Sequence, residues 1–231
     1  MSVLKELKPL TPSAFFEVRG KIPRWCRRER LDERSLPRRK VQGGRWSEPL
    51  TSTPSQAEKK KQFKKGRLPD VTGLTGEGKL IQLALLWSPV GLYIEMESKL
   101  GLEKGDRLEL FIDTRDLKTS NVITRFCHHF VFDLEEEQGR EETRFRGEDQ
   151  HELADSSLFA FKTEMKHLSY RVEIALPKEA LYGYDPSEFK RLGFCYRFKR
   201  RNGEKEHFNL SSEHFNLEKH PALWASMELV E

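Results

Sequence analysis

Apolar and polar residues alternate through the last two thirds of the chain with the period of two that is typical of β-strands. The segments LIQLALLW at 80–87 and VGLYIEME at 90–97 are separated only by Ser88 and Pro89, which predicts a hairpin. In RLELFIDT at 107–114, leucine and isoleucine side chains occupy one face of the predicted strand and polar residues with Phe111 occupy the other. These segments predict a sheet with one apolar face.

The pattern continues to residue 231. Further strands are predicted at 124–134, 157–165, 169–177, 192–200 and 223–231. The connections between them are short or polar, and no helix of 10–15 residues separates consecutive strands, so a parallel sheet is not expected. About eight strands favour an all-β fold, an antiparallel β-sandwich of the jelly-roll or immunoglobulin-like kind.

The first 67 residues lack this alternation. SAFFEVRG at 13–20 predicts one strand, whereas 24–67 is rich in charged residues, Pro, Gly and Ser and predicts a basic, irregular excursion. We therefore divide the chain into an N-terminal segment at 1–23 with one strand, an excursion at 24–67, and a sandwich at 68–231.

Charge follows the same division. Residues 1–67 hold 19 Lys and Arg against 7 Asp and Glu, a net charge of +12, and the remaining 22 against 30 give −8, so the total of +4 conceals a basic arm on an acidic body. The basic clusters RRER, PRRK and EKKKQFKKGR lie near Trp25, Trp46 and Phe63, a combination that would suit nucleic acid or an acidic partner. A solvated basic linker is the alternative interpretation.

Several functional classes lack their sequence signals. There is no apolar run of 18 residues and no apolar core of a secretory signal, so a cytoplasmic protein is expected. Cys26, Cys127 and Cys195 are too few and too scattered for a disulfide framework or a paired CxxC zinc site. GxSxG, P-loop, HExxH and GxGxxG motifs are absent, so we do not expect an enzyme.

Five motifs occur in a fixed order: GLYIEME, GDRLELFIDTRD, YRVEIALPKEAL, LGFCYRF and HPALWASMELV. In this order they resemble the DOMON-type sandwich of family 9 carbohydrate-binding modules, and also uncharacterised bacterial proteins of that superfamily. The resemblance covers about residues 67–231. It implies a non-catalytic module that stacks a saccharide on aromatic rings and hydrogen-bonds its hydroxyls, and some members of the family hold structural calcium.

Binding residues are predicted on two grounds. Trp87, Tyr93 and Trp224 lie near strand ends, where exposed rings would stack on a sugar, although large aromatic residues also fill cores. If the leucine and phenylalanine faces point inward, the opposite faces gather polar residues that would bind a saccharide or another polar ligand. These are Glu95, Glu109, Asp113, Arg125, His129 and Arg197, together with Tyr93, Phe111, Cys127 and Cys195. An ion-paired sheet face is the alternative.

Candidate metal ligands are few. Asp106, Asp113 and Asp116 offer hard oxygen atoms for calcium, as in some relatives, but their spacing is not that of an EF-hand. His128 and His129 point to opposite faces of their strand and cannot chelate one ion together. Cys127 and His129 with Cys195 would make a three-ligand set. A metal- or haem-binding redox domain is a further alternative. Its haem ligands would be Met96 and His128.

Overall fold

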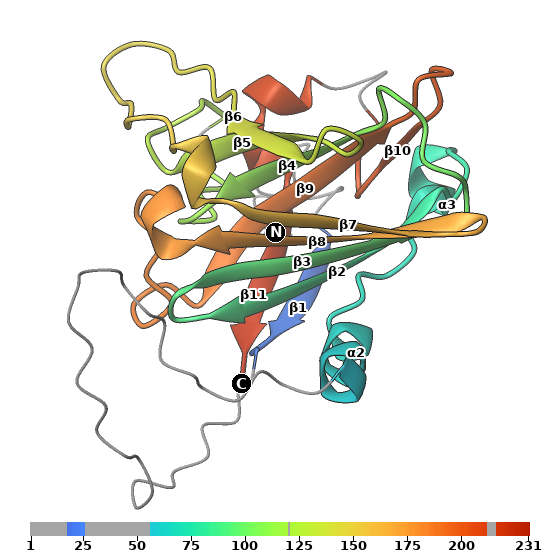
Figure 1. Cartoon of the computed structure of the whole chain (residues 1–231). Helices are drawn as coiled ribbons and strands as arrows, with labels where there is room; N and C mark the ends of the chain where they lie inside the picture. Colours follow the sequence, from blue (N-terminus) through green and yellow to red (C-terminus); the bar gives the residue numbers. More distant parts are fainter. Residues whose placement is uncertain (1–17, 26–55, 120, 212–215) are drawn as a thin grey trace, which may run out of the picture.

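A computed structural model describes residues 18–25, 56–119, 121–211 and 216–231. Within these residues two β-sheets pack face to face (Figure 1). The larger sheet has seven strands in the order β1-β11-β9-β4-β5-β6, with β10 paired to β9, and the smaller sheet has the order β2-β3-β8-β7. All pairs of strands are antiparallel except β1 with β11. The predicted all-β sandwich is confirmed.

The strands of the larger sheet are β1 (Arg19–Pro23), β4 (Arg107–Asp113), β5 (Cys127–Asp133), β6 (Gln138–Glu141), β9 (Arg191–Lys199), β10 (Lys205–His207) and β11 (Ala225–Val230). Those of the smaller sheet are β2 (Ile81–Ser88), β3 (Gly91–Ser98), β7 (Ala160–Lys166) and β8 (Ser169–Pro177). The helices are α2 (Gln56–Lys65) and α3 (Thr72–Thr75), with 3-10 turns η1 (Ser156–Leu158), η2 (Lys178–Ala180), η3 (Leu217–Lys219) and η4 (Pro221–Leu223).

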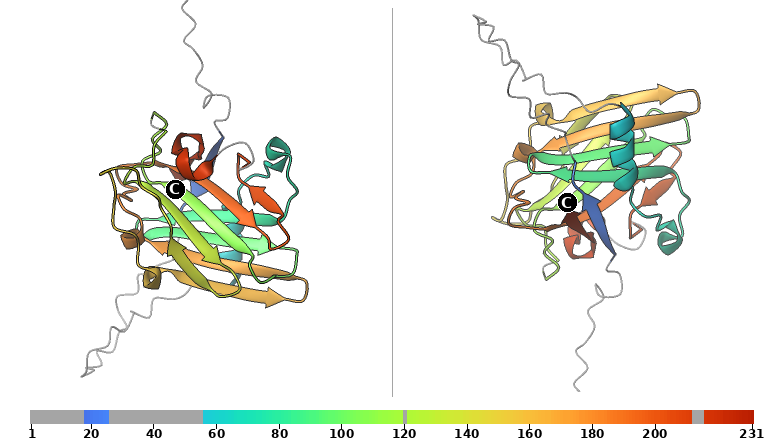
Figure 2. Two further views of the ribbon diagram at one scale, coloured as in Figure 1. Left: turned by 90° about the horizontal axis from the view of Figure 1, so that it is seen from above. Right: turned by 90° about the horizontal axis from the view of Figure 1, so that it is seen from below.

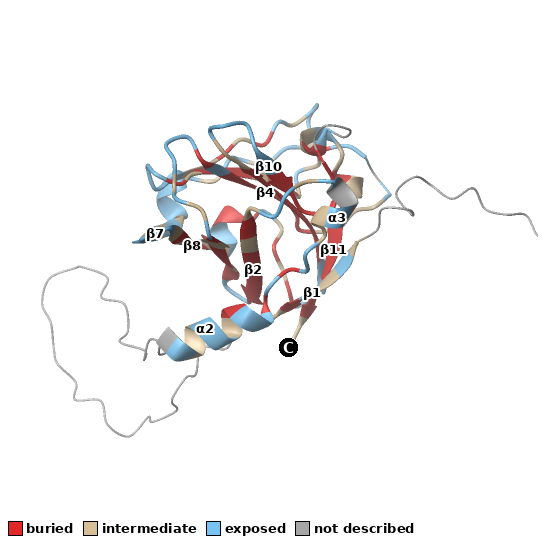
Figure 3. Cartoon of the chain, turned by 90° about the vertical axis from the view of Figure 1, so that its right-hand side faces the viewer, coloured by how far each residue is buried: buried red, intermediate tan, exposed pale blue. Residues whose placement is uncertain are grey.

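The core lies between the two sheets, as the alternation predicts. On β4, Leu108, Leu110 and Ile112 are fully buried in this core, and they face Leu83 and Leu85 of the smaller sheet's inner side as part of one cluster. Figure 3 shows buried residues concentrated on the strands and exposed residues on α2 and the connections. Burying each such side chain contributes about 1.5–3 kcal/mol, so packing of the two inner faces is the main source of stability.

The predicted hairpin joins β2 and β3, with Pro89 and Val90 at its turn. Gly91 follows with φ 147°, and a Cβ atom placed there would lie 2.2 Å from the carbonyl oxygen of Leu176. Only glycine therefore lets β3 approach β8 at this point.

The N-terminal strand extends beyond its predicted end at residue 20. β1 covers 19–23, and residues 13–17 of the expected strand lie outside the described residues. After β1 the chain passes to the other layer, where the backbone N–H of Trp25 donates to the carbonyl of Trp87 at 2.7 Å. One short segment thus pairs with β11 of the larger sheet and then with β2 of the smaller.

Helix α2 replaces part of the predicted irregular excursion. Its sequence QAEKKKQFKK consists largely of good helix formers, with Glu58 in the first turn and Lys64 and Lys65 in the last, where each charge favours the helix dipole. Phe63 is buried against Ala84 and Leu86, and Figure 2 shows α2 lying across the outer face of the smaller sheet. A single buried apolar residue gives no helical period, which is why the sequence pattern missed it.

Residues 26–55 of the excursion lie outside the described residues. Contact of the basic arm with nucleic acid or an acidic partner therefore stays a prediction. Across the described ranges, none of the helices combines the length and apolar character needed to cross a bilayer.

A buried carboxylate joins the two layers beside α3. Glu206 of β10 is fully buried, and its Oε2 accepts hydrogen bonds from the backbone N–H of Ile81 at 2.8 Å and of Leu80. Its Oε1 accepts from the Tyr196 hydroxyl at 2.7 Å and from Lys79 Nζ at 3.0 Å. The carboxylate thus anchors the start of β2, in the smaller sheet, to β10 in the larger.

Replacing Glu206 with alanine is expected to lower the free energy of unfolding by about 3–5 kcal/mol, because buried amides and a hydroxyl lose their acceptor. Urea unfolding followed by fluorescence measures the change. Glu204→Ala is the matched control, since its side chain is 53% exposed in the neighbouring turn, and it should cost less than about 1 kcal/mol. Equal losses for the two variants would contradict the anchoring role.

Candidate functional site

The polar residues predicted to share one face lie on opposite sides of the sandwich. Tyr93 and Glu95 point outward from β3 in the smaller sheet, whereas Glu109, His129 and Arg197 lie on the outer face of the larger sheet. The alternation within each strand is as predicted. The assignment of strands to two sheets, which the alternation does not determine, separates them.

A groove of about 450 Å³ lies beside α2 on the outer face of the smaller sheet. We name it the α2 groove. Three aromatic rings form one side of the groove. Trp25 stacks on Tyr93, with 5.2 Å between the ring centroids and 24° between the ring planes. The centroids of the Trp25 and Phe63 rings are 5.4 Å apart. We call these three residues the aromatic cluster. The groove is also lined by Lys59, Lys162 and Glu173, and by Ile94, Phe159, Ala160, Phe161, Ile174 and Ala175.

Each ring of the aromatic cluster is placed by a different part of the fold. Tyr93 is an outward residue of β3, Phe63 is on α2, and Trp25 follows the crossing from β1 to Trp87. Tyr93 was predicted as a binding residue. Trp25 and Phe63 were considered only as stacking residues of a basic arm, because no pattern in the sequence indicates that they meet Tyr93.

The charged residues that line the α2 groove each pair with a charge of opposite sign. Lys59 Nζ of α2 lies 4.0 Å from Glu173 Oε2 of β8, and Lys162 Nζ on β7 contacts Glu164 Oε1 at 2.7 Å. All four side chains retain some exposure. The groove therefore combines apolar ring surface with hydrogen-bonding groups of both signs that water reaches.

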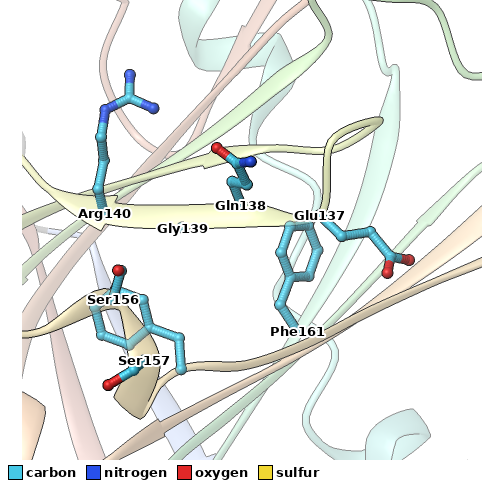
Figure 4. Close-up of a pocket in the computed structure, with 8 residues that line it drawn as sticks. Glu137, Gln138, Gly139, Arg140, Ser156, Ser157 and Phe161 are labelled. Carbon is cyan, nitrogen blue, oxygen red and sulfur yellow. The ribbon is translucent and has the colours of Figure 1, made fainter.

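A second hollow of about 380 Å³ opens between β6 and β7 at the edge of the sandwich, and Phe159 and Phe161 line both hollows. Figure 4 shows the side chain of Arg140 leaving β6 on the side away from Ser156 and Ser157. Arg140 pairs there with Asp133 and Glu142, each at 2.7 Å. Because its polar side chains diverge, this hollow is a weaker ligand site than the α2 groove.

Trp87 and Trp224 lie in the core. Their residues are 3% and 2% exposed, and each indole N–H donates to a backbone carbonyl, of Val230 at 2.9 Å and of Leu217 at 3.0 Å. Neither residue lines the α2 groove. The two tryptophans therefore occupy core positions, as the alternative interpretation of large aromatic residues expected.

Glu95 is on the same face as Tyr93 but is covered. Its side chain is 5% exposed and pairs with Arg171. Burial raises the pKa of the Glu95 carboxyl above its ordinary value, and the Arg171 pair only partly opposes this. Glu95 supports the sheet beside the groove without lining it.

Glu109, His129 and Arg197 form an ion-paired cluster on the larger sheet. The Glu109 carboxylate accepts from His129 Nε2 at 3.0 Å, from Lys199 Nζ at 2.8 Å and from Arg197, while the ring of Phe111 stacks on His129 at 4.4 Å. Burial raises the pKa of Glu109, but these hydrogen bonds and charges outweigh it and hold that pKa well below its usual range. The arrangement matches the ion-paired alternative. Arg125, in contrast, is half-exposed and pairs with Asp149 at 2.5 Å.

The three aspartates predicted for calcium do not lie together. Asp106 directly precedes β4 and Asp113 ends it, about 23 Å apart at 3.3 Å per residue. The Asp113 carboxylate accepts the backbone N–H groups of Arg115 at 2.9 Å and Leu117 at 2.7 Å. Asp116 pairs with Lys118 at 2.8 Å and also contacts Ser226. Calcium binding stays a prediction, now confined to Asp113 and Asp116.

The cysteine and haem sets are also dispersed. Cys195 is fully buried and donates to the carbonyl of Phe208 at 3.0 Å, and burial raises the pKa of the Cys127 thiol to about 12. His129 is bonded to Glu109 instead of to a cysteine. Met96 lies on the smaller sheet and His128 on the larger, where both ring nitrogens of His128 face oxygen atoms. These residues do not fit a haem.

One cluster was not predicted. His128, Glu141 and His151 bring one ligand atom each to within 4.8 Å of one another. His128 was noted in the sequence, but Glu141 and His151 belong to a polar stretch without a motif. Only the pairing of Phe130 with Glu141 across β5 and β6 brings the carboxylate beside His128.

The ion-paired cluster predicts a pH dependence. The pKa of Glu109 in the folded state lies below the ordinary value of 4.5. Ionised Glu109 therefore stabilises the folded state above about pH 4.5, and this stabilisation is lost as the pH falls below 4.5. The free energy of unfolding of the wild type should fall by about 2 kcal/mol more than that of Glu109→Gln between about pH 5 and pH 3. Urea unfolding across this range measures it. Glu228→Gln, which changes an exposed carboxylate, should behave like the wild type, and parallel pH profiles for wild type and Glu109→Gln would contradict the prediction.

Comparison with known proteins gives likenesses of fold. No family model matches the chain, and no curated protein matches it. Among solved structures, it is similar to a family 9 carbohydrate-binding module from Caldicellulosiruptor kristjanssonii in complex with cellotriose, with 18% identity and a TM-score of 0.46 over 64% of this chain and 74% of that one. A family 9 module from the same organism in complex with glucose gives 15% identity and a TM-score of 0.49, over 71% and 89% of the two chains.

Proposed function

We propose that the chain is a non-catalytic binding module that holds a saccharide in the α2 groove. The observation that carries the proposal is the aromatic cluster bordered by Lys59, Lys162 and Glu173. Sugars present apolar C–H faces that pack on aromatic rings and hydroxyls that exchange hydrogen bonds with charged groups. The α2 groove offers both kinds of contact side by side.

The shape of the groove supports a small ligand. Its volume of about 450 Å³ falls in the range of about 300–1,000 Å³ usual for ligand pockets. Its floor is a sheet and one wall is a helix packed on that sheet, so the contacting groups are largely in place before a ligand arrives. The motifs that resemble family 9 modules point to the same class of ligand.

The charged residues support binding in preference to hydrolysis. Glycoside hydrolysis ordinarily uses two carboxyl groups on either side of the scissile bond. Among the described residues that line the groove, Glu173 is the single carboxylate, and it faces Lys59 at 4.0 Å. Such a lining can orient hydroxyls, but it lacks the acid and base pair of a hydrolase.

The proposal predicts that the full chain binds a saccharide and that Trp25→Ala weakens binding about five- to thirtyfold, since a lost stacking contact costs about 1–2 kcal/mol. A glycan array identifies the ligand and titration calorimetry measures its affinity. Trp25→Phe, which keeps a ring, should bind more tightly than Trp25→Ala.

Lys162→Ala should weaken binding several-fold, whereas Lys166→Ala should not, because Lys166 is an exposed residue of the same strand outside the groove. Near-UV circular dichroism checks that each variant is folded. Absence of binding to every glycan tested, or equal affinity of Trp25→Ala and wild type, would overturn the proposal.

A further inference from the structure

Three buried side chains from three segments meet at one edge of the larger sheet. His128 is on β5, Glu141 ends β6, and His151 is in the connection that follows. His128 Nδ1 lies 2.9 Å and His151 Nε2 lies 3.0 Å from the same atom, Glu141 Oε1. The exposed fractions of the three side chains are 0%, 0% and 2%.

The far nitrogen of each ring faces a backbone carbonyl. His151 Nδ1 is 2.6 Å from the carbonyl oxygen of Arg125, and His128 Nε2 is 3.4 Å from that of Tyr182. A carbonyl and a carboxylate both accept hydrogen bonds, so each ring has an acceptor facing both of its nitrogens. When an ion replaces the hydrogen at the near nitrogen, the far nitrogen still donates to its carbonyl. Two ring nitrogens and a carboxylate oxygen thus lie within 4.8 Å of one another inside the protein.

The carboxylate is held in place by donors of its own. Thr143 Oγ1 donates to Glu141 Oε1 at 2.6 Å, and the backbone N–H of Ala154 donates to Oε2 at 2.8 Å. Both carboxylate oxygens of Glu141 therefore have donors that fix the orientation of the group.

We propose that His128 Nδ1, Glu141 Oε1 and His151 Nε2 bind a divalent transition-metal ion of the zinc class. Two imidazole nitrogens and one carboxylate oxygen form a donor set that such ions favour, whereas calcium prefers six to eight oxygen ligands. Tetrahedral ligand atoms held about 2.0–2.2 Å from zinc lie about 3.3–3.6 Å apart, so the two separations of 2.9 and 3.0 Å here would widen by about half an ångström around an ion. The ion binds the two ring nitrogens that otherwise face the carboxylate.

The surroundings have the form of an outer shell around a metal. Ligating histidines ordinarily donate their second N–H to a carbonyl or carboxylate, and ligating carboxylates are hydrogen-bonded in turn. Each of the three ligands here has such a partner, in Tyr182, Arg125, Thr143 and Ala154. With a carbonyl at its far nitrogen, each ring can direct its near nitrogen at an ion.

The site lies one side chain below the surface. The ring of Tyr182, a residue that is 45% exposed, stacks on His151 with 5.5 Å between centroids and 6° between planes, and Phe145 meets His151 edge-on at 4.7 Å. Displacement of the Tyr182 ring would admit an ion. Three protein ligands leave a coordination position for water, which this cover shields from bulk solvent.

The test uses the untagged full chain, because a histidine tag would itself bind the probes. After treatment with EDTA and dialysis, the protein is titrated with Zn²⁺ and with Co²⁺. We expect about one ion per chain by elemental analysis, a visible absorption band with Co²⁺, and a higher melting temperature with Zn²⁺.

The variants separate this site from adventitious binding. His151→Gln and Glu141→Gln should lose the stoichiometric ion and the Co²⁺ band. His129→Gln is the matched control, because His129 neighbours His128 on β5 but points to the opposite face and contacts Glu109. It should retain both.

Two results would overturn the proposal. One is folded wild-type protein that takes up neither Zn²⁺ nor Co²⁺. The other is a Co²⁺ band of equal strength in the wild type and His151→Gln. If the glutamate variant does not fold, the comparison of wild type, His151→Gln and His129→Gln still decides the matter.

Discussion

Packing of the two inner sheet faces is the interaction on which the rest of the structure depends. Because strand residues alternate between faces, the buried set at Leu108, Leu110 and Ile112 fixes where Glu109 and Asp113 point. The outer faces are then used differently. The larger sheet carries an ion-paired cluster around Glu109, and the smaller sheet is partly covered by α2 and leaves the α2 groove beside it.

The sequence predicted the sandwich well because its strands obey a local rule. Alternation located β2 through β5 and β7, β8, β9 and β11, and it placed His128 and His129 on opposite faces. It missed α2, whose one buried residue, Phe63, leaves no helical period. The local pattern also does not say which strands share a sheet, and for that reason Tyr93 and Glu109 were expected on one face.

The candidate sites were harder to predict because they depend on contacts between distant segments. Of the predicted binding residues, Tyr93 lines the α2 groove, and its neighbour Trp25 is 68 residues earlier in the sequence. The sequence does not show that Trp87 and Trp224 are core residues whereas Tyr93 lines the groove. A buried indole N–H needs an acceptor, and the carbonyls of Val230 and Leu217 that accept here are identified only by the fold. The meeting of Glu141 with two histidines likewise depends on the register of β5 and β6.

The parallel pairing of β1 with β11 bears on how the protein folds during synthesis. β1 is made early, but its partner in the larger sheet spans residues 225–230. A growing chain must therefore carry β1 without its partner in the larger sheet until residues 225–230 have left the ribosome. Contacts between such distant residues form slowly. Trp25 follows β1 directly, yet its contacts are with Trp87, Tyr93 and Phe63, so the aromatic side of the α2 groove can assemble long before β1 pairs with β11.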